Sequence, residues 1–259
     1  MRADSQGHFE EAAECKAVGK VHHRCCSEDR ARLVSAERCA NRTWASPRCW
    51  AILLLVVVVG LSLDLWTKSW AFEHVAGQPV VISRQALLDN PSYNPIPFHE
   101  GQVFIPGRML NFHLVLNSGA VFGIGSEQRG FFIVFTVVAV MVAIYIFGWQ
   151  TRPRSTLAHV GIGLVLAGAL GNLWDRLALG RVRDFLHMFP DRHLPFGLNW
   201  FGGGSEVFPW VFNIADVLLL LGMAVLLVHL HFSDQQQRSD QSKADPVEAG
   251  EGSEGSKPS

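Results

Sequence analysis

The chain has 259 residues, a net charge of -1, 49% hydrophobic residues and only 17% charged residues. A soluble enzyme of this size would carry about 25% charged residues, and a nucleic-acid-binding domain would concentrate Lys and Arg into a strongly basic whole. The composition therefore argues against both classes, and it also excludes collagen-like, disulfide-scaffold and fully disordered chains. No nucleic acid is expected as a partner.

Residues 1–48 are polar and rich in Arg, and we expect a disordered cytoplasmic extension there. Four of the five cysteines lie in this stretch and the fifth directly follows it. They are Cys15, Cys25, Cys26, Cys39 and Cys49. On the reducing side of a membrane they should not form disulfides, and with His22 and His23 they show neither a CxxC pair nor an HxxxH spacing, so no metal site is predicted.

Four later segments have the length and apolar character needed to cross a bilayer, for which about 20 residues suffice. They are roughly Trp50–Trp70, Phe131–Trp149, Leu157–Leu179 and Phe208–Phe232. Tryptophans stand near several of their ends, where an amphipathic ring prefers the headgroup region. The expected fold is an all-α polytopic membrane protein in which residues 49–232 form a four-helix domain.

Lys and Arg close to the spans predict the orientation. The link between the second and third spans contains Arg152 and Arg154, and the extension before the first span ends near Arg48. Both therefore belong in the cytoplasm, and four spans return the C-terminal tail, 233–259, to the same side. We expect this polar tail to be disordered, and the long connections, about 73–130 and 180–207, to face outward.

Ionisable side chains at membrane depth are costly, so by default they face a bundle interior and mark a functional site. The first span holds Asp64 and Lys68 four residues apart, a spacing that lets an acid and a base pair on one helix face. A structural ion pair explains this spacing as well as a catalytic one does.

The third span combines a small-residue face with a polar end. Gly163, Ala167 and Gly171 recur every four residues, a pattern that lets helices pack closely in lipid. The polar residues of its outer turns are Asn172, Asp175 and Arg176. They predict a polar patch where this helix leaves the membrane.

Two further aspartates lie at outward ends of their segments. Asp216 follows Asn213 at the start of the fourth span, and Asp184 follows the third span. Two carboxylates held close together retain one proton between them. Such a pair offers a general base for water and a general acid for a carbonyl, which permits peptide hydrolysis without a metal or cofactor.

Four motifs in this order carry a resemblance: DLWTK (64–68), NSGAVFG (117–123), GNLWDRLALGRVRDF (171–185) and FNIAD (212–216). Together they resemble the bacterial lipoprotein signal peptidase family, also called signal peptidase II. The resemblance implies an aspartyl endopeptidase of the inner membrane, multi-pass and able to work as a monomer, with its active site near the outer face. It would remove signal peptides from diacylglyceryl-modified prolipoproteins, just before the lipidated cysteine.

Matched residue by residue, the resemblance assigns the catalytic pair to Asp184 and Asp216. The positions that it implies for shaping the site and holding the substrate are Asn117, Gly119, Asn172, Asp175, Arg176, Asn213, Asp64 and Lys68. It also implies a small extracytoplasmic sheet that cradles the substrate. Alternating apolar residues from Leu110 to Leu116 have the period of a half-buried strand, and Asn117 to Gly119 supply turn chemistry.

Three features depart from the family pattern: Arg183 stands where an apolar residue is usual, the outward loops (Gly77–Pro106 and Pro190–Gly204) are long, and the N-terminal extension has no counterpart. Arg183 could lower the pKa of Asp184 or point to lipid headgroups. Two other functions stay open from the residues alone. A small proton-coupled transporter would spread its acidic residues through membrane depth, and a non-catalytic scaffold would bind lipid-modified partners.

Overall fold

The structure, a computed structural model, describes residues 43–90, 92–107, 109–119, 129–190, 192–200 and 205–244. Four long helices dominate it: α3 (Pro47–His74), α5 (Arg129–Tyr145), α6 (Thr156–Ala178) and α7 (Ile214–Ala244). A π-helical segment, η2 (Ile146–Gln150), extends α5. All four helices are long and apolar enough to cross a membrane, which confirms the four predicted spans.

Helix α6 lies at the centre of the bundle and packs against α3, α5 and α7. Its small residues make this possible. A methyl group on Gly163 would lie 2.9 Å from the side chain of Val56 in α3, and one on Gly168 would collide with the carbonyl of Ala215 in α7. The small-residue face predicted for the third span therefore serves close helix packing.

The fourth helix differs from its prediction at both ends. It begins at Ile214 rather than Phe208, because Val211–Phe212 form a short strand, β4, that pairs with a neighbouring strand. It continues to Ala244, past Phe232 and into the tail predicted to be disordered. Four of the twelve extra residues are Gln, and Arg238, Lys243 and Ala244 are also good helix formers, which sustain a helix once it has been nucleated although Ser and Asp favour it less. Residues 245–259 lie outside the described part of the chain.

Ordered structure also begins before the predicted end of the N-terminal extension. Thr43–Ala45 form a 3-10 helix, η1, and the Thr43 hydroxyl donates to the Thr151 carbonyl at 2.6 Å. Trp44 packs against Trp149 with ring centroids 5.0 Å apart. The predictions for residues 1–42, including four of the five cysteines and both histidines, lie outside the described residues; Cys49 is buried and free.

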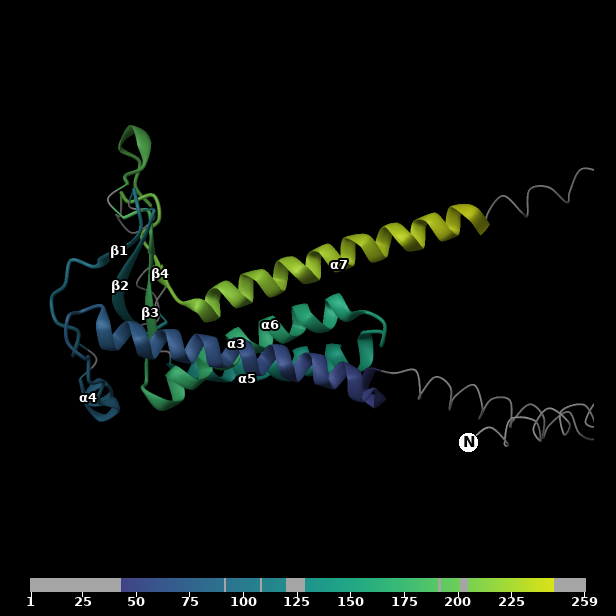
Figure 1. The fold of residues 1–259 in the computed structure, drawn as a ribbon, viewed down its shortest axis with the longest axis horizontal. Helices are drawn as coiled ribbons and strands as arrows, with labels where there is room; N and C mark the ends of the chain where they lie inside the picture. Colours follow the sequence, from purple (N-terminus) through teal and green to yellow (C-terminus); the bar gives the residue numbers. More distant parts are fainter. Residues whose placement is uncertain are drawn as a thin grey trace, which may run out of the picture.

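Four antiparallel strands form one sheet at one end of the helices (Figure 1). In spatial order they are β1 (Gln102–Ile105), β2 (Leu110–Asn117), β3 (Val182–Met188) and β4. The strand predicted from the alternation at 110–117 is therefore confirmed as β2. The short helix α4 (Arg84–Asp89), inside the long first connection, was not predicted.

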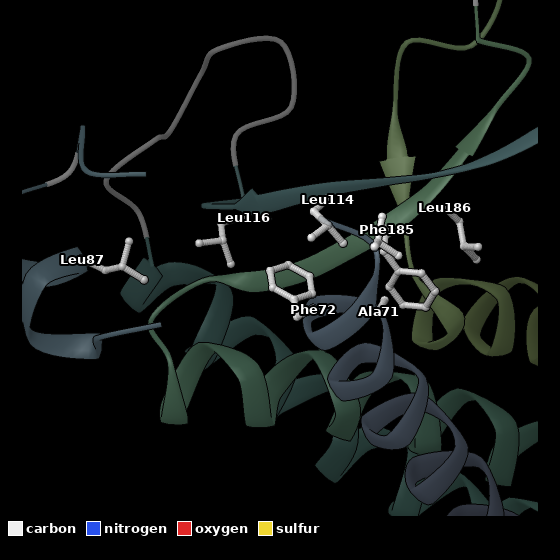
Figure 2. Close-up of a cluster of buried hydrophobic side chains, with 8 residues drawn as sticks. Ala71, Phe72, Leu87, Leu114, Leu116, Phe185 and Leu186 are labelled. Carbon is white, nitrogen blue, oxygen red and sulfur yellow. The ribbon is translucent and has the colours of Figure 1, made fainter. Parts of the chain in front are cut away.

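A hydrophobic cluster joins the sheet to α3 and α4 (Figure 2). One face of β2 and β3 meets the C-terminal end of α3, with Leu87 of α4 at the edge. The buried members are Ala71, Phe72, Val75, Leu87, Leu114, Leu116, Phe185 and Leu186. Burying such side chains stabilises a structure by about 1.5–3 kcal/mol each. The cluster thereby fixes the strand that carries Asp184 against the end of the bundle.

Candidate active site

Asn213 and Asp216 form the N-terminal cap of α7. The Asn213 side-chain oxygen accepts from the backbone N–H of Asp216 at 3.2 Å, and the Asp216 carboxylate accepts from the backbone N–H of Asn213 at 3.2 Å. This reciprocal pair has the form of a capping box. It holds Asp216 in the first turn of the helix, where the helix dipole favours a negative charge.

Asp184 lies on β3, directly outside the membrane-spanning helices, and is 1% exposed. Asn117 of β2 donates to its Oδ2 at 2.9 Å, and Asn213 donates to its Oδ1 at 2.6 Å. Burial and the nearby charge of Asp216 raise the pKa of Asp184 from its usual 3.8 to about 7. Asp184 is therefore placed to carry a proton near neutral pH.

Asn172 of α6 connects the two carboxyl groups. Its Nδ2 donates to Asp216 Oδ1 at 2.8 Å, while its Oδ1 accepts from Asn213 at 3.1 Å and from Lys68 at 3.0 Å. The two asparagines thus form a continuous hydrogen-bonded bridge from Asp184 to Asp216. Because both amides are nearly or fully buried, the bridge fixes the position of one carboxyl relative to the other.

A second set of charges lies behind this bridge. Lys68 forms an ion pair with Asp64 at 2.8 Å and approaches Asp175 at 3.5 Å, and all three side chains are fully buried. Asp64 also accepts from the backbone N–H of Ala215 at 2.8 Å, which satisfies another free amide at the start of α7. The predicted pair of Asp64 and Lys68 therefore ties α3 to α6 and α7.

Arg183 does neither of the two things predicted for it. Its guanidinium forms an ion pair with Asp175 at 2.8 Å, and its backbone N–H donates to the same carboxylate at 3.0 Å. The side chain thus points to α6 and leaves Asp184 on the other face of β3. Asp175 lies only eight residues before Arg183 in the chain, but a contact between a helix end and the strand that follows it has no spacing signal in the sequence.

Arg176 and Gly119 border the site. Arg176 interacts electrostatically with Asp216 and Asp184, and its guanidinium lies 5.3 Å from the centre of the Phe132 ring. Gly119 has a φ of +93° and donates to Asn117 Oδ1 at 2.7 Å, which is the predicted turn. A side chain there would also collide with Phe132. Arg129 and Phe132 were not predicted as site residues. Arg129 donates to the Arg176 carbonyl. The only signal for either residue in the sequence is its place at the start of a span.

All ten predicted site residues thus lie in or around one polar cluster, at the end of the bundle that carries the sheet. The cluster contains four carboxyl groups and three basic side chains (Lys68, Arg176 and Arg183). Acidic residues gathered at one depth are not the distribution that a transporter predicts.

The fold and this cluster define a multi-pass membrane protein with a paired-carboxylate site at one end of its helices. A family model described as signal peptidase (SPase) II, an A8 peptidase, matches residues 56–232. A lipoprotein signal peptidase of Anaeromyxobacter sp. (strain Fw109-5) is 31% identical over 193 residues, covering 70% of this chain and 84% of that protein. One from Acinetobacter baumannii (strain ATCC 17978) is 33% identical, covering 72% and 86%. The chain belongs to the signal peptidase II family and is an aspartic peptidase.

A solved bacterial membrane enzyme, determined by the in meso method at 2.3 Å resolution, is also similar. It is 25% identical, with a TM-score of 0.49, over 76% of this chain and 94% of that one. Among the residues that the structure describes, no group of three or more His, Cys, Asp or Glu side chains is arranged to hold a metal ion.

Proposed function

We propose that Asp184 and Asp216 are the catalytic pair with which this peptidase cleaves signal peptides from diacylglyceryl-modified prolipoproteins, before the lipidated cysteine. The observation that carries the assignment is the asparagine bridge, which holds two carboxyl groups from different elements in one buried site. The relatives named lipoprotein signal peptidase support the substrate class.

The surroundings give each carboxyl a different role. Asp184 has its pKa raised to about 7, so it is the group that holds the proton and polarises the scissile carbonyl. Asp216, at the N-terminus of α7, is the general base that takes a proton from the attacking water. Asp216 then passes the proton taken from water to the amine that leaves, and Asp184 recovers its proton from a hydroxyl group of the tetrahedral intermediate as the new carboxyl group forms. No cofactor enters this scheme.

The remaining predicted residues act as supports. Asn117, Asn172 and Asn213 hold the carboxyls through the hydrogen bonds given above, and Gly119 fixes Asn117. Lys68, Asp64 and Asp175 hold the three helices together. Arg176 interacts electrostatically with both carboxyl groups, and it provides a positive charge for the oxygen on which negative charge develops.

The orientation follows from the arginines of the connection between η2 and α6. With Arg152 and Arg154 in the cytoplasm, both tails are cytoplasmic and the sheet and the catalytic pair face outward, in contact with the outer leaflet of the inner membrane. One copy of the chain supplies every group in the site, which supports a monomeric enzyme. Membrane-impermeant maleimide should label a cysteine introduced at exposed Asp89 in spheroplasts, and one at exposed Gln235 only after lysis.

The decisive experiment is cleavage of a diacylglyceryl-modified prolipoprotein by the purified protein. Asp184→Asn and Asp216→Asn should each lose at least about 100-fold in rate, since general acid-base groups contribute about 10²–10⁴-fold. Asp89→Asn, the same exchange on the exposed end of α4, should cleave like the wild type. Mass spectrometry of the product should place the cut before the lipidated cysteine.

Two controls separate the alternatives. Wild-type cleavage should survive a chelator, and thermal melting should show that both variants fold. Activity retained by either variant would break the assignment of the pair. Failure of a folded wild type to cleave would instead favour a transporter or a scaffold.

A further inference from the structure

A large groove opens between three helices at the end of the bundle opposite to the catalytic pair. Its volume is about 1550 Å³. Its apolar walls come from all three helices, with Ala139, Val142 and Ala143 of α5, Ile162 and Val165 of α6, and Leu226 of α7. In Figure 1, α7 extends past the other helices at this end, and its residue Leu226 packs against Gly161 of α6. The groove lies within the membrane-spanning segments, so its walls are suited to hydrocarbon.

The end of this groove is basic. Arg152 and Arg154, on the connection between η2 and α6, line it together with Ser155 and Thr156. Both arginines are exposed, and neither forms an ion pair with any residue that the structure describes. None of the described residues that line the groove is acidic. The site therefore carries two uncompensated positive charges above an apolar slot.

The connection that carries the arginines is ordered by its own hydrogen bonds. The backbone N–H of Ser155 donates to the Arg152 carbonyl at 2.9 Å, and that of Thr156 donates to the Arg154 carbonyl at 3.0 Å. Thr151 holds the connection to Thr43. The guanidinium groups are thus presented from a fixed backbone, which lowers the entropy lost when they bind a ligand.

We propose that this groove is a binding site for one anionic phospholipid of the leaflet opposite to the catalytic pair. The acyl chains lie between α5, α6 and α7, and the phosphate lies between Arg152 and Arg154. Charge complementarity selects the occupant: guanidinium groups pair with phosphate oxygens in two-point contacts, and basic pockets between membrane helices bind anionic headgroups. A positively charged peptide segment would be repelled from the same place.

The proposal can be tested by native mass spectrometry of the full chain in detergent. Phosphatidylglycerol is compared with phosphatidylcholine of the same acyl chains, and glycerol phosphate, which lacks the chains, is offered as a competitor. The wild type should retain one phosphatidylglycerol in preference to phosphatidylcholine, and glycerol phosphate should not displace it. In the double variant Arg152→Gln/Arg154→Gln, affinity for phosphatidylglycerol should fall about tenfold while that for phosphatidylcholine stays unchanged.

Two further variants make the result specific. Arg48→Gln removes an exposed arginine near the same end of the bundle that does not line the groove, and it should bind like the wild type. Ala139→Phe fills the apolar part of the groove and should weaken both lipids. Equal retention of phosphatidylglycerol by the wild type and the double glutamine variant would overturn the proposal, as would displacement by glycerol phosphate alone. Because lipid binding needs no cleavage, its outcome is independent of the catalytic assignment.

Discussion

Asn213 donates a hydrogen bond of 2.6 Å to Asp184 while its own side-chain oxygen caps the helix that carries Asp216. One buried amide therefore performs two tasks. It stabilises the start of α7, and it couples the strand bearing one carboxyl to the helix bearing the other. These tasks can be separated by substitution, because a shorter side chain can cap the helix without reaching β3.

Asn213→Ala should lose both functions. Loss of a helix cap costs about 1 kcal/mol, and a buried acceptor left without its donor costs about 1–3 kcal/mol more, so thermal stability and cleavage should both fall. Asn213→Ser keeps a good cap but cannot reach Asp184. It should regain much of the lost melting temperature and remain at least about tenfold slower than the wild type. A serine variant with wild-type kcat/KM would show that the bridge is not needed.

The pH dependence follows from the raised pKa of Asp184. If Asp184 is the acid, cleavage should fall about tenfold per pH unit above about 7, as its proton is lost. The folded state keeps a proton that the unfolded chain releases near 3.8, so the contribution of Asp184 to stability is fully present below that pH and is lost as the pH rises to about 7. In the wild type, the melting temperature should fall between pH 3.8 and about 7, and the cleavage rate should fall above about 7. In Asp184→Asn the melting profile should be flatter, and an unchanged profile would contradict the shift.

The sequence predicted what local periodicity can encode. Four apolar runs predicted four spans, and the spacing of Asn213 and Asp216 is that of the capping box found at the start of α7. The start of that helix was placed six residues too early, because Val211–Phe212 are as apolar as a span and only their pairing with β3 makes them a strand. Hydropathy does not distinguish an apolar strand in a sheet from the first turn of a membrane-spanning helix.

The site could be predicted in its members but not in its pairings. Asp64 and Lys68 contact each other along one helix, which their spacing indicates. The contacts from Asn172 to Asp216 and from Asn117 to Asp184 join segments 44 and 67 residues apart, and they exist only because the helices and the sheet pack together. The prediction for Arg183 was wrong because the face of β3 on which its side chain lies depends on how the sheet packs.

Arg183→Leu should therefore affect stability more than chemistry. It leaves the buried Asp175 carboxylate with Lys68 at 3.5 Å as its remaining ion pair, and breaking a buried pair from one side costs about 3 kcal/mol. Arg183→Lys keeps the charge and should melt between the leucine variant and the wild type. At temperatures where the variants are folded, kcat should change less than about tenfold, because Asp184 keeps both asparagine donors. A leucine variant that melts like the wild type yet fails to cleave would place Arg183 in the reaction.

Gly171 tests the packing behind the site. A methyl group at this position in α6 would collide with the Asp64 carboxylate and lie 3.4 Å from the Ala215 side chain. Gly171→Ala should therefore push Asp64 away from Lys68 and from the Ala215 N–H, at a cost of about 1–3 kcal/mol. It should also slow cleavage, because Asp64 supports the first turn of the helix that carries Asp216. Gly130→Ala is the matched control, since a methyl group there meets nothing within 4 Å, and it should melt and cleave like the wild type. Equal melting temperatures for the two alanine variants would mean that α3 and α6 can move apart freely, and the ion pair would then not fix the site.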